Sequence, residues 1–282
     1  MQGKSFIANI IKGATNAIQK IFHNPYRGTG LNFFDIKILK HLPPGKSYTR
    51  KLGEHTIHFS DPQELLHGLK EIFIEKIYDQ SLPENARIID CGSNIGMSIL
   101  YLKQIAPTAS IIGFEPDDQN FALLQKNING NNLGKTEIHK AAVWKENTTL
   151  SFQVTGSMGS AIDTTGDSSN TVDVKAVRLK DYLKEKVDFL KIDIEGAEYE
   201  VIKDIASELH NVKKLFIEYH GTYQQNNELL EILNIVSNAG FSFYIKEAAS
   251  IYDHPFIRKR NGVWNYDVQL NIFCNRSGGN EG

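Results

Sequence analysis

The feature that most constrains the fold is a regular alternation of short apolar segments and amphipathic segments from residue 86 onward. Residues 87–91, 110–114 and 187–194 are apolar over the length of a strand and carry few charges. The segments that follow them repeat apolar residues with helical spacing. Apolar strands that alternate with amphipathic helices are typical of a mostly parallel sheet with helices on both faces. The alternation therefore predicts a doubly wound α/β domain.

The remaining elements are expected at intervals that fit this pattern. Further strands are predicted at residues 137–143, 150–154, 171–177, 214–219, 241–246 and 267–274, with a weaker hairpin strand at 51–60. Helices are predicted at residues 60–78, 95–105, 118–129, 198–209 and 227–239.

Length and composition agree with this interpretation. The chain has 282 residues, of which 41% are apolar and 23% are charged, as in soluble globular proteins. This length allows one large domain with an appended cap. We expect residues 1–80 to form an N-terminal helical cap for substrate selection or oligomer formation. Residues 81–275 should form the main domain, and residues 276–282 a disordered tail.

Net charge and cysteine content exclude several classes of protein. The formal net charge is −2, and Lys and Arg are spread along the chain, which argues against a nucleic-acid-binding face. The two cysteines, Cys91 and Cys274, do not form a C-x-x-C pattern, so neither a disulfide scaffold nor a zinc ribbon is expected. Together with the lack of a signal-peptide pattern in the first 22 residues, these properties predict a reduced, cytoplasmic protein.

The first 22 residues have the periodicity of an amphipathic helix. Apolar residues fall on one helical face, and lysines lie elsewhere. No segment of the sequence approaches the roughly 20 apolar residues that a transmembrane span requires. We expect this helix to pack on its own domain or to form the contact of a homodimer. The alternative is a helix that lies on an anionic membrane surface.

The most informative motif joins the strand at residues 87–91 to the helix that follows it. Its turn contains two glycines, which allow a sharp turn and the close approach of a ligand. A dinucleotide would need the G-x-G-x-x-G pattern, which is absent. An acid in the strand suits instead the cationic amino-acid portion of S-adenosylmethionine. The residues expected to bind this portion are Asp90, Gly92, Ser93, Asn94 and Gly96.

Residues near two later strand ends complete the predicted cofactor site. Glu115, followed by Pro116, lies at the end of the second strand, where a carboxylate can accept both ribose hydroxyls. Ala142 and its apolar neighbours lie near the end of the third strand and offer a wall for adenine. Ligands of doubly wound sheets bind outside the carboxyl ends of the strands, so these residues should meet the first motif.

A third constellation lies at the ends of two further strands. Asp193 and Glu195 belong to the run K-I-D-I-E-G-A-E at residues 191–198, and Glu218 and His220 end the next strand. Carboxylates at a strand end are costly to bury without partners, which indicates a functional site. Each of the four is a candidate base for a substrate hydroxyl, although His220 could instead be a partner of Glu218. Asp193 is also expected to contact the cofactor, and it could alternatively bind a divalent cation such as Mg²⁺.

These motifs resemble the FkbM family of S-adenosylmethionine-dependent methyltransferases. The likeness spans about residues 71–273 and depends most on K-I-D-I-E-G-A-E, because D-C-G-S-N-I-G alone would fit most class I methyltransferases. The resemblance implies a class I, Rossmann-like fold with a mostly parallel seven-stranded sheet. It also implies methyl transfer to a hydroxyl of a sugar or glycan, a polyketide or another secondary metabolite. By the same resemblance, Glu71 and Tyr78 belong to an entry helix that helps to close the cofactor site.

The sequence leaves two other functions open. A NAD-type oxidoreductase predicts a third glycine in the first turn, which this chain lacks. A catalytically silent cofactor-binding module, acting through protein contacts, predicts loss of the strand-end acids, which are present. A nucleic-acid methyltransferase is disfavoured by the neutral charge balance. We expect residues 1–80 and the Gly- and Ser-rich loop at residues 155–170 to select the acceptor.

Overall fold

The computed structural model describes residues 26–153, 171–260, 262 and 265–276. The predicted N-terminal helix, the loop at residues 155–170 and residues 277–282 of the predicted tail lie outside the described residues. The chain divides into two compact units, one of residues 1–79 with 126–132 and the other of residues 80–125 with 133–282. In the described part of the chain, no helix has the length and apolar character needed to cross a membrane.

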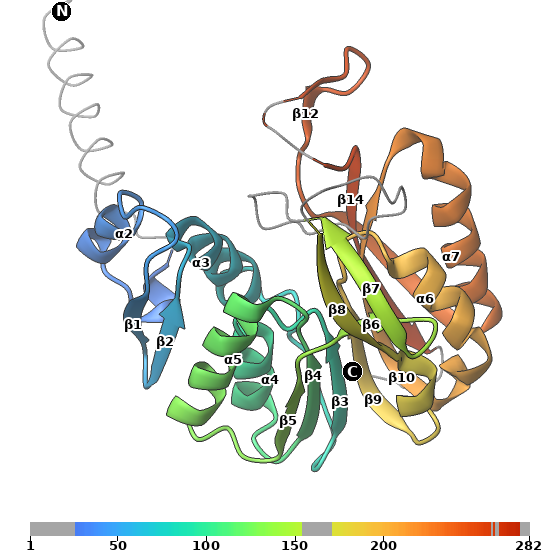
Figure 1. The fold of residues 1–282 in the computed structure, drawn as a ribbon, viewed down its shortest axis with the longest axis horizontal. Coiled ribbons are helices and arrows are strands. Elements are labelled where there is room, and N and C mark those ends of the chain that lie inside the picture. Colours follow the sequence, from blue (N-terminus) through green and yellow to red (C-terminus); the bar gives the residue numbers. More distant parts are fainter. Residues whose placement is uncertain (1–25, 154–170, 261, 263–264, 277–282) are drawn as a thin grey trace, which may run out of the picture. The chain divides into compact units, whose positions relative to one another are not determined.

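A seven-stranded sheet forms the centre of the larger unit (Figure 1). Its strands follow the order β11-β14-β10-β9-β3-β4-β5. Their bounds are β3 Arg87–Cys91, β4 Ser110–Phe114, β5 Thr136–His139, β9 Val187–Ile192, β10 Val212–Gly221, β11 Phe241–Glu247 and β14 Val268–Arg276. Within this sheet β14 runs antiparallel to β10 and β11, while the other adjacent strands are parallel. The prediction of a doubly wound, mostly parallel seven-stranded sheet is therefore confirmed.

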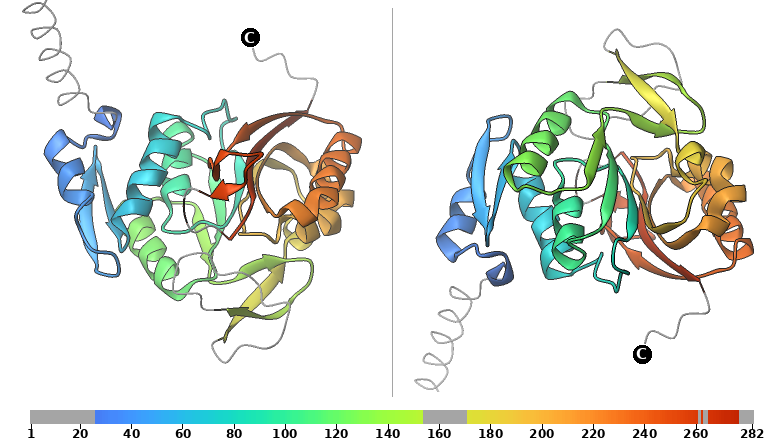
Figure 2. Two further views of the ribbon diagram at one scale, coloured as in Figure 1. Left: turned by 90° about the horizontal axis from the view of Figure 1, so that it is seen from above. Right: turned by 90° about the horizontal axis from the view of Figure 1, so that it is seen from below.

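Helices lie on both faces of this sheet (Figure 2). They are α4 Met97–Ile105, α5 Asp118–Gly130, α6 Glu198–Ile205 and α7 Asn226–Asn238. Successive residues of a strand point to opposite faces, and Leu190 and Ile192 of β9 belong to a buried cluster with Val201 of α6. Lys191 between them points to the other face, where it meets residues of β3 and the turn after it. All residues of β9 are buried, as expected for a central parallel strand.

The prediction of a single strand at residues 137–143 is wrong. The segment forms β5 of the main sheet and then a strand of a separate three-stranded sheet. That second sheet has the order β6-β8-β7, with bounds Ala142–Trp144, Thr171–Arg178 and Thr148–Gln153. The amide of Ala141 donates to the carbonyl of His139 at 3.0 Å, so the chain turns between β5 and β6. A turn this short leaves the apolar pattern unbroken, which is why the sequence does not reveal it.

Two strand ends also differ from the prediction, and both affect the site. β9 ends at Ile192 rather than at residue 194, so Asp193 and Glu195 lie in the loop after the strand. β10 continues to Gly221, because β14 pairs with it along this whole stretch. His220 therefore lies within a sheet strand rather than after one.

The smaller unit combines short helices with a two-stranded hairpin. Its elements are η1 Arg27–Thr29, α2 Phe33–Leu39, β1 Tyr48–Leu52, β2 His55–Phe59, α3 Pro62–Gly68 and the π-helix η2 Leu69–Ile74. Asp61 caps α3 by accepting hydrogen bonds from the amides of Gln63 and Glu64, as the sequence predicts for this helix start. The helix expected to continue to residue 78 changes to π geometry after α3 and ends at Ile74.

An unexpected hairpin lies between β11 and β14. It consists of β12 Tyr252–His254 and β13 Lys259–Arg260. The remaining short helices are η3 Leu179–Tyr182, η4 Ala206–Asn211 and η5 Tyr223–Gln225. The chain leaves β11 and enters β14 at the edge of the sheet where β3, β9 and β10 end, so the hairpin belongs to that edge.

Candidate active site

The predicted cofactor turn follows β3 directly. Gly92 and Gly96 have positive φ angles of 82° and 90°, and Asn94 between them has a φ of 47°. A Cβ atom on Gly92 would lie 1.8 Å from the carbonyl oxygen of Asp193, so a side chain does not fit here. The turn therefore packs directly against the loop after β9, which brings the first and third predicted motifs together.

Asp90, near the end of β3, is fully buried and is held from two sides. Its carboxylate accepts a hydrogen bond from Ser98 Oγ at 2.6 Å and lies 3.3 Å from Lys191 Nζ. The same ammonium group donates to the carbonyl of Gly92 at 2.8 Å and lies 3.2 Å from Asp193 Oδ2. Lys191 thus holds two acids and the glycine turn in one fixed arrangement.

Glu115 follows β4, the strand beside β3. Its buried carboxylate accepts hydrogen bonds from the amides of Asn94 at 2.8 Å and Asp117 at 3.0 Å. Burial raises the pKa of Glu115 to about 7, although these two amides lower it. Ser93 Oγ donates to the carbonyl of Asp90 at 3.0 Å, and Pro116 is half-buried beside Glu115. The turn and this carboxylate therefore form one hydrogen-bonded group.

Three predicted cofactor residues lie elsewhere in the chain. Ala142 is buried at the start of β6, in the separate sheet, where it pairs with Ala176. Glu71, in η2, and Tyr78 belong to the smaller unit. Their part in cofactor binding stays a prediction.

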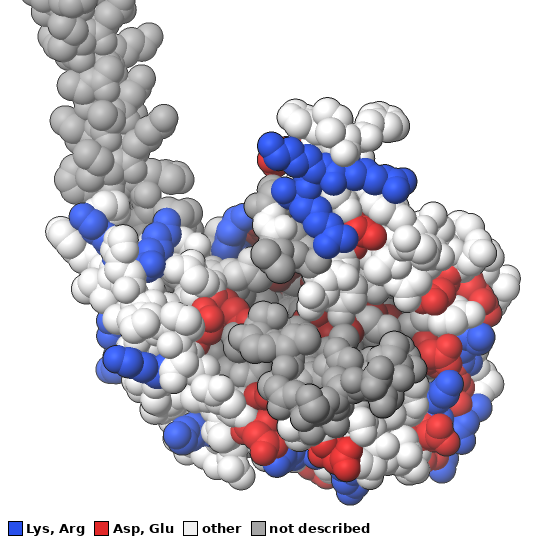
Figure 3. Space-filling model, turned by 45° about the horizontal axis from the view of Figure 1, so that its top comes forward, with Lys and Arg blue, Asp and Glu red and all other residues white. Residues whose placement is uncertain are grey.

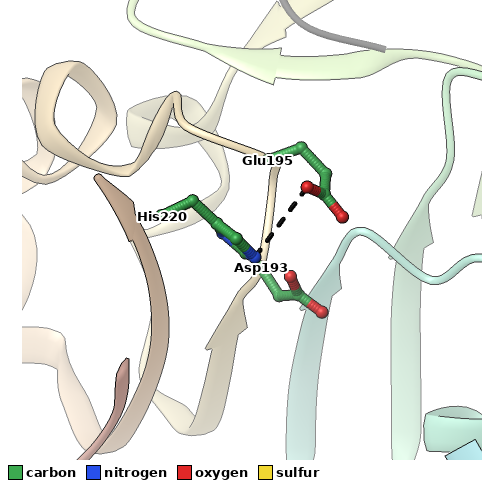
Figure 4. A group of neighbouring side chains, drawn as sticks. All are labelled: Asp193, Glu195 and His220. Atoms are coloured by element: carbon green, nitrogen blue, oxygen red, sulfur yellow. Dashed lines mark ion pairs between the residues drawn. The ribbon is translucent and has the colours of Figure 1, made fainter. Parts of the chain in front are cut away.

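The predicted catalytic residues gather where β9 and β10 end (Figure 4). Asp193, Glu195 and His220 each offer one potential ligand atom, and these atoms lie within 4.8 Å of one another. His220 Nε2 lies 3.8 Å from Glu195 Oε2 and 3.6 Å from Glu218 Oε1. The structure thus brings all four residues together from two separate strand ends.

Acidic side chains surround His220 and decide its protonation. Its Nδ1 lies 3.1 Å from Oε1 of Glu198, and both side chains are buried. Burial alone would lower the pKa of the imidazole, but the charges of Glu198, Glu218 and Glu195 hold that pKa well above its ordinary value of 6.5. His220 therefore carries a proton near neutral pH and balances part of the surrounding negative charge.

Glu198 also shapes the loop before α6. Its carboxylate accepts hydrogen bonds from the amides of Ile194 at 3.2 Å and Gly196 at 3.0 Å. Glu195, between them, has a φ of 56°, which is uncommon for a residue with a side chain. Glu198 begins α6, where a negative charge is favourable, and it additionally fixes the loop that carries Glu195.

The carboxyls of the cluster differ in exposure and in pKa. The side chain of Glu195 is 45% exposed, against 25% for Asp193 and 16% for Glu218. The pKa of Glu195 is raised to about 7, mainly by desolvation and also by the neighbouring acids, while His220 acts to lower it. Desolvation and the charge of Asp193 also raise the pKa of Glu218. Glu195 is therefore the carboxyl that combines access to a ligand with a pKa near neutrality.

Tyr266 joins the cluster from a distant part of the chain and is not among the predicted residues. Its hydroxyl donates to the carbonyl of Glu195 at 2.6 Å, and its ring centroid lies 5.0 Å from that of His220. A Cβ atom on Gly196 would lie 3.2 Å from this hydroxyl. Lys191 and Glu198 are part of the third sequence motif, whereas Tyr266 lies 71 positions from Glu195 and no local pattern indicates its role.

The chain is similar in sequence to known methyltransferases. Residues 90–243 match the methyltransferase FkbM domain family. Methyltransferase 1 of Beauveria bassiana is 30% identical over 198 residues, which cover 60% of this chain and 79% of that protein. Methyltransferase sdnD of Sordaria araneosa is 30% identical over 203 residues, which cover 57% of this chain and 78% of that protein.

A solved structure with a similar chain fold is methyltransferase FkbM from Methylobacillus flagellatus KT. It aligns with a TM-score of 0.47 and 17% identity, over 75% of this chain and 54% of that chain. The predicted resemblance is confirmed by the match to the family and by the identity to Methyltransferase 1. The chain belongs to the FkbM family and is a methyltransferase.

Proposed function

We propose that this methyltransferase uses S-adenosylmethionine to methylate a hydroxyl group of a sugar, a glycan or a secondary metabolite. The observation that carries the proposal is the backbone contact between Gly92 and Asp193. It joins the glycine turn after β3 to the loop that bears the half-exposed carboxylates, so a methyl donor in the turn would lie beside potential proton acceptors. The net charge of −2 favours a small molecule or a glycan over a nucleic acid as the acceptor.

In this proposal Asp90 and the turn at residues 92–96 bind the methionine portion, and Glu115 binds the ribose. The cofactor, when bound, supplies a methyl group activated by a positively charged sulfur. Asp90 is already held by Ser98 and Lys191, so binding would not require it to move. Hydroxyl groups that donate to Glu115 would favour its charged form and would lower its pKa from about 7.

Glu195 is the proposed proton acceptor. When an acceptor hydroxyl takes the methyl group from the cofactor's sulfur, the carboxylate of Glu195 would accept the hydroxyl proton. A general base is most effective when its pKa lies near the working pH, and Glu195 combines a pKa of about 7 with a side chain that is 45% exposed. The less exposed Asp193 and Glu218 assist by raising this pKa through their charges.

His220 has a positioning role in this scheme. Its side chain is 2% exposed, and its pKa lies well above 6.5, so it is neither accessible nor unprotonated near neutral pH. The imidazolium instead lies between Glu198 and Glu195 and keeps the two acids at a fixed separation.

A divalent cation held by Asp193, Glu195 and His220 is a second candidate arrangement. Their donor atoms are close enough to share an ion, and Glu198 would hold the other imidazole nitrogen, as carboxylates commonly do for metal-binding histidines. A cation bound there would acidify the substrate hydroxyl. The imidazole ligand favours a transition metal such as Mn²⁺ over Mg²⁺, which prefers oxygen. Loss of transfer with EDTA, and recovery with Mn²⁺ but not Mg²⁺, would support this arrangement, whereas unchanged transfer would exclude it.

The proposal is tested by transfer of a radiolabelled methyl group from S-adenosylmethionine into fractionated cell extract. We expect label in a saccharide or metabolite fraction, strongly reduced with the Glu195→Gln variant. Cofactor binding by calorimetry without transfer in any fraction would favour the catalytically silent module. No binding of S-adenosylmethionine would overturn the proposal, and binding of NAD in its place would favour the oxidoreductase.

A further inference from the structure

The hairpin formed by β12 and β13 stands at the same edge of the sheet as the site (Figure 1). Its two ends are anchored to the sheet: the amide of Ala248 donates to the carbonyl of Gln269 at 3.0 Å, and the amide of Asp267 donates to that of Gly221 at 2.8 Å. Gly221 directly follows His220. The hairpin therefore projects from the rim of the active site.

The tip of the hairpin exposes two large apolar side chains. Phe256 is 105% exposed and Ile257 is 73% exposed. The turn that presents them is closed by hydrogen bonds from the amides of Ile257 and Arg258 to the carbonyl of His254, at 2.9 and 3.1 Å. Two neighbouring apolar side chains exposed to this degree on one projecting turn indicate a site of interaction with another molecule or with a membrane.

Basic side chains follow the tip immediately. Arg258, Lys259 and Arg260 are consecutive and exposed, and Asp253 is the one carboxylate among residues 252–260. Figure 3 shows a band of basic side chains beneath an uncharged tip at the top of the view. The hairpin thus has an apolar tip, Phe256 and Ile257, and a basic collar, which consists of Arg258, Lys259 and Arg260.

Contacts at the base hold this collar in place. The guanidinium of Arg260 pairs with Asp267 at 2.6 Å, and the hydroxyl of Tyr252 donates to the same carboxylate. Arg258 lies over the ring of Tyr223, 4.1 Å from its centroid. Lys259 makes no ion pair with the residues that the structure describes, so its charge is available to a partner.

We propose that the tip of this hairpin inserts into the surface of an anionic lipid bilayer, with Phe256 and Ile257 in the interface and Arg258 and Lys259 at the headgroups. Apolar side chains flanked by cations are the arrangement that binds such surfaces. A projecting tip of two side chains offers far less area than the roughly 800 Å² per partner of a stable protein interface. A soluble anion would use the collar but would leave the apolar tip exposed. Membrane binding goes beyond the proposed function and does not depend on it.

The experiment is sedimentation of the full chain with vesicles of phosphatidylcholine alone or mixed with phosphatidylserine. We expect binding to the mixed vesicles that weakens with added salt. Phe256→Ser should weaken it about tenfold, because a buried ring is lost from the interface. Lys259→Glu should weaken it about fivefold or more. Because both side chains are exposed, circular dichroism and thermal unfolding should match those of the unaltered chain.

Two control variants carry the same chemical changes elsewhere on the larger unit. Leu230→Ser removes a side chain of α7 that is 59% exposed, and Lys213→Glu reverses an exposed charge at the start of β10, at the opposite edge of the sheet. Both should bind vesicles as the unaltered chain does. Equal binding by all variants, or equal binding to neutral and anionic vesicles, would overturn the proposal. Weakening by Lys259→Glu without any effect of Phe256→Ser would also overturn the proposed insertion, because it would show that the basic side chains bind anionic headgroups by charge alone.

Discussion

Two neighbouring regions of the same sheet edge hold their acids in different ways. Where β3 and β4 end, Asp90 accepts from Ser98 at 2.6 Å, and Glu115 accepts from two backbone amides. Where β9 and β10 end, Glu195 and Glu218 lie 3.8 and 3.6 Å from the same imidazole nitrogen of His220. The first region therefore holds its acids with hydroxyl and amide donors, together with Lys191 beside Asp90, whereas the second region gathers its acids around one imidazolium.

This difference suits the two regions to separate steps of methyl transfer. Asp90 and Glu115 are buried and are held by hydroxyl and amide donors, and Asp90 also by Lys191, so these two acids form a rigid recognition surface. Desolvation raises the pKa of both Glu115 and Glu195 to about 7, but Glu115 is buried, whereas the side chain of Glu195 is 45% exposed and can take a proton from a bound substrate. Lys191 contacts an acid of each region, Asp90 and Asp193, and thereby sets the distance between them.

The largest effect is expected from a substitution confined to the region where β9 and β10 end. Glu195→Gln should reduce the rate of methyl transfer about 10²- to 10⁴-fold, because the amide cannot accept the hydroxyl proton. In the unaltered enzyme the rate should fall as the pH drops through about 7, where Glu195 becomes protonated. Measurement of kcat against pH, with cofactor affinity by calorimetry, checks both points. Glu185→Gln, at an exposed position before β9, should change neither. An unchanged rate of methyl transfer with Glu195→Gln would show that another group accepts the hydroxyl proton.

The second prediction concerns the contact between the two regions, which a side chain at Gly92 would disrupt. Gly92→Ala would place a Cβ atom 1.8 Å from the carbonyl of Asp193, so the turn and the loop after β9 must move apart. Overpacking of this kind typically lowers the free energy of unfolding by about 1–3 kcal/mol. This loss adds to the cost of about 1–2 kcal/mol for a side chain at positive φ.

The matched control for Gly92→Ala is Gly45→Ala. Gly45 also has a positive φ, 82°, but a Cβ atom there would have no other atom within 4 Å. Urea unfolding should show the positive-φ cost in both variants and the additional loss in Gly92→Ala alone. Equal losses would mean that the contact between the two regions is softer than the geometry indicates.

The smallest effect is expected from a substitution of Glu115, in the region where β3 and β4 end. Glu115→Gln should weaken S-adenosylmethionine binding about tenfold, because an amide offers one acceptor atom to two ribose hydroxyls. It should also flatten the pH dependence of stability. The pKa of Glu115 is raised from 4.5 to about 7 in the folded chain, so ionisation of this group reduces stability as the pH rises through that interval.

Calorimetry and urea unfolding between pH 4.5 and about 7 test the two parts of this prediction. Glu84→Gln, at an exposed position before β3, is the control and should leave both quantities unchanged. Unchanged cofactor affinity with Glu115→Gln would show that Glu115 does not bind the ribose of the cofactor.

The class of the sheet and the residue types at the strand ends could be predicted from the amino-acid sequence. Strand and helix periodicity are local properties, and in a parallel sheet every strand delivers its final residues to the same edge. Asp90, Glu115, Asp193 and His220 could therefore be placed near one another without knowing the strand order. The family resemblance rested on the same local motifs.

Features that depend on contacts between distant residues could not be predicted from the sequence. The pairing of β14 with β10 extends that strand to Gly221 and places His220 within the sheet, and Tyr266 reaches Glu195 across 71 positions of sequence. The protonation of His220 follows from three acids that converge only in the folded chain. Neither the hairpin at residues 252–260 nor the turn between β5 and β6 has a distinctive local pattern. Local periodicity specifies each element, but register, charge balance and burial are sums over neighbours that the fold alone brings together.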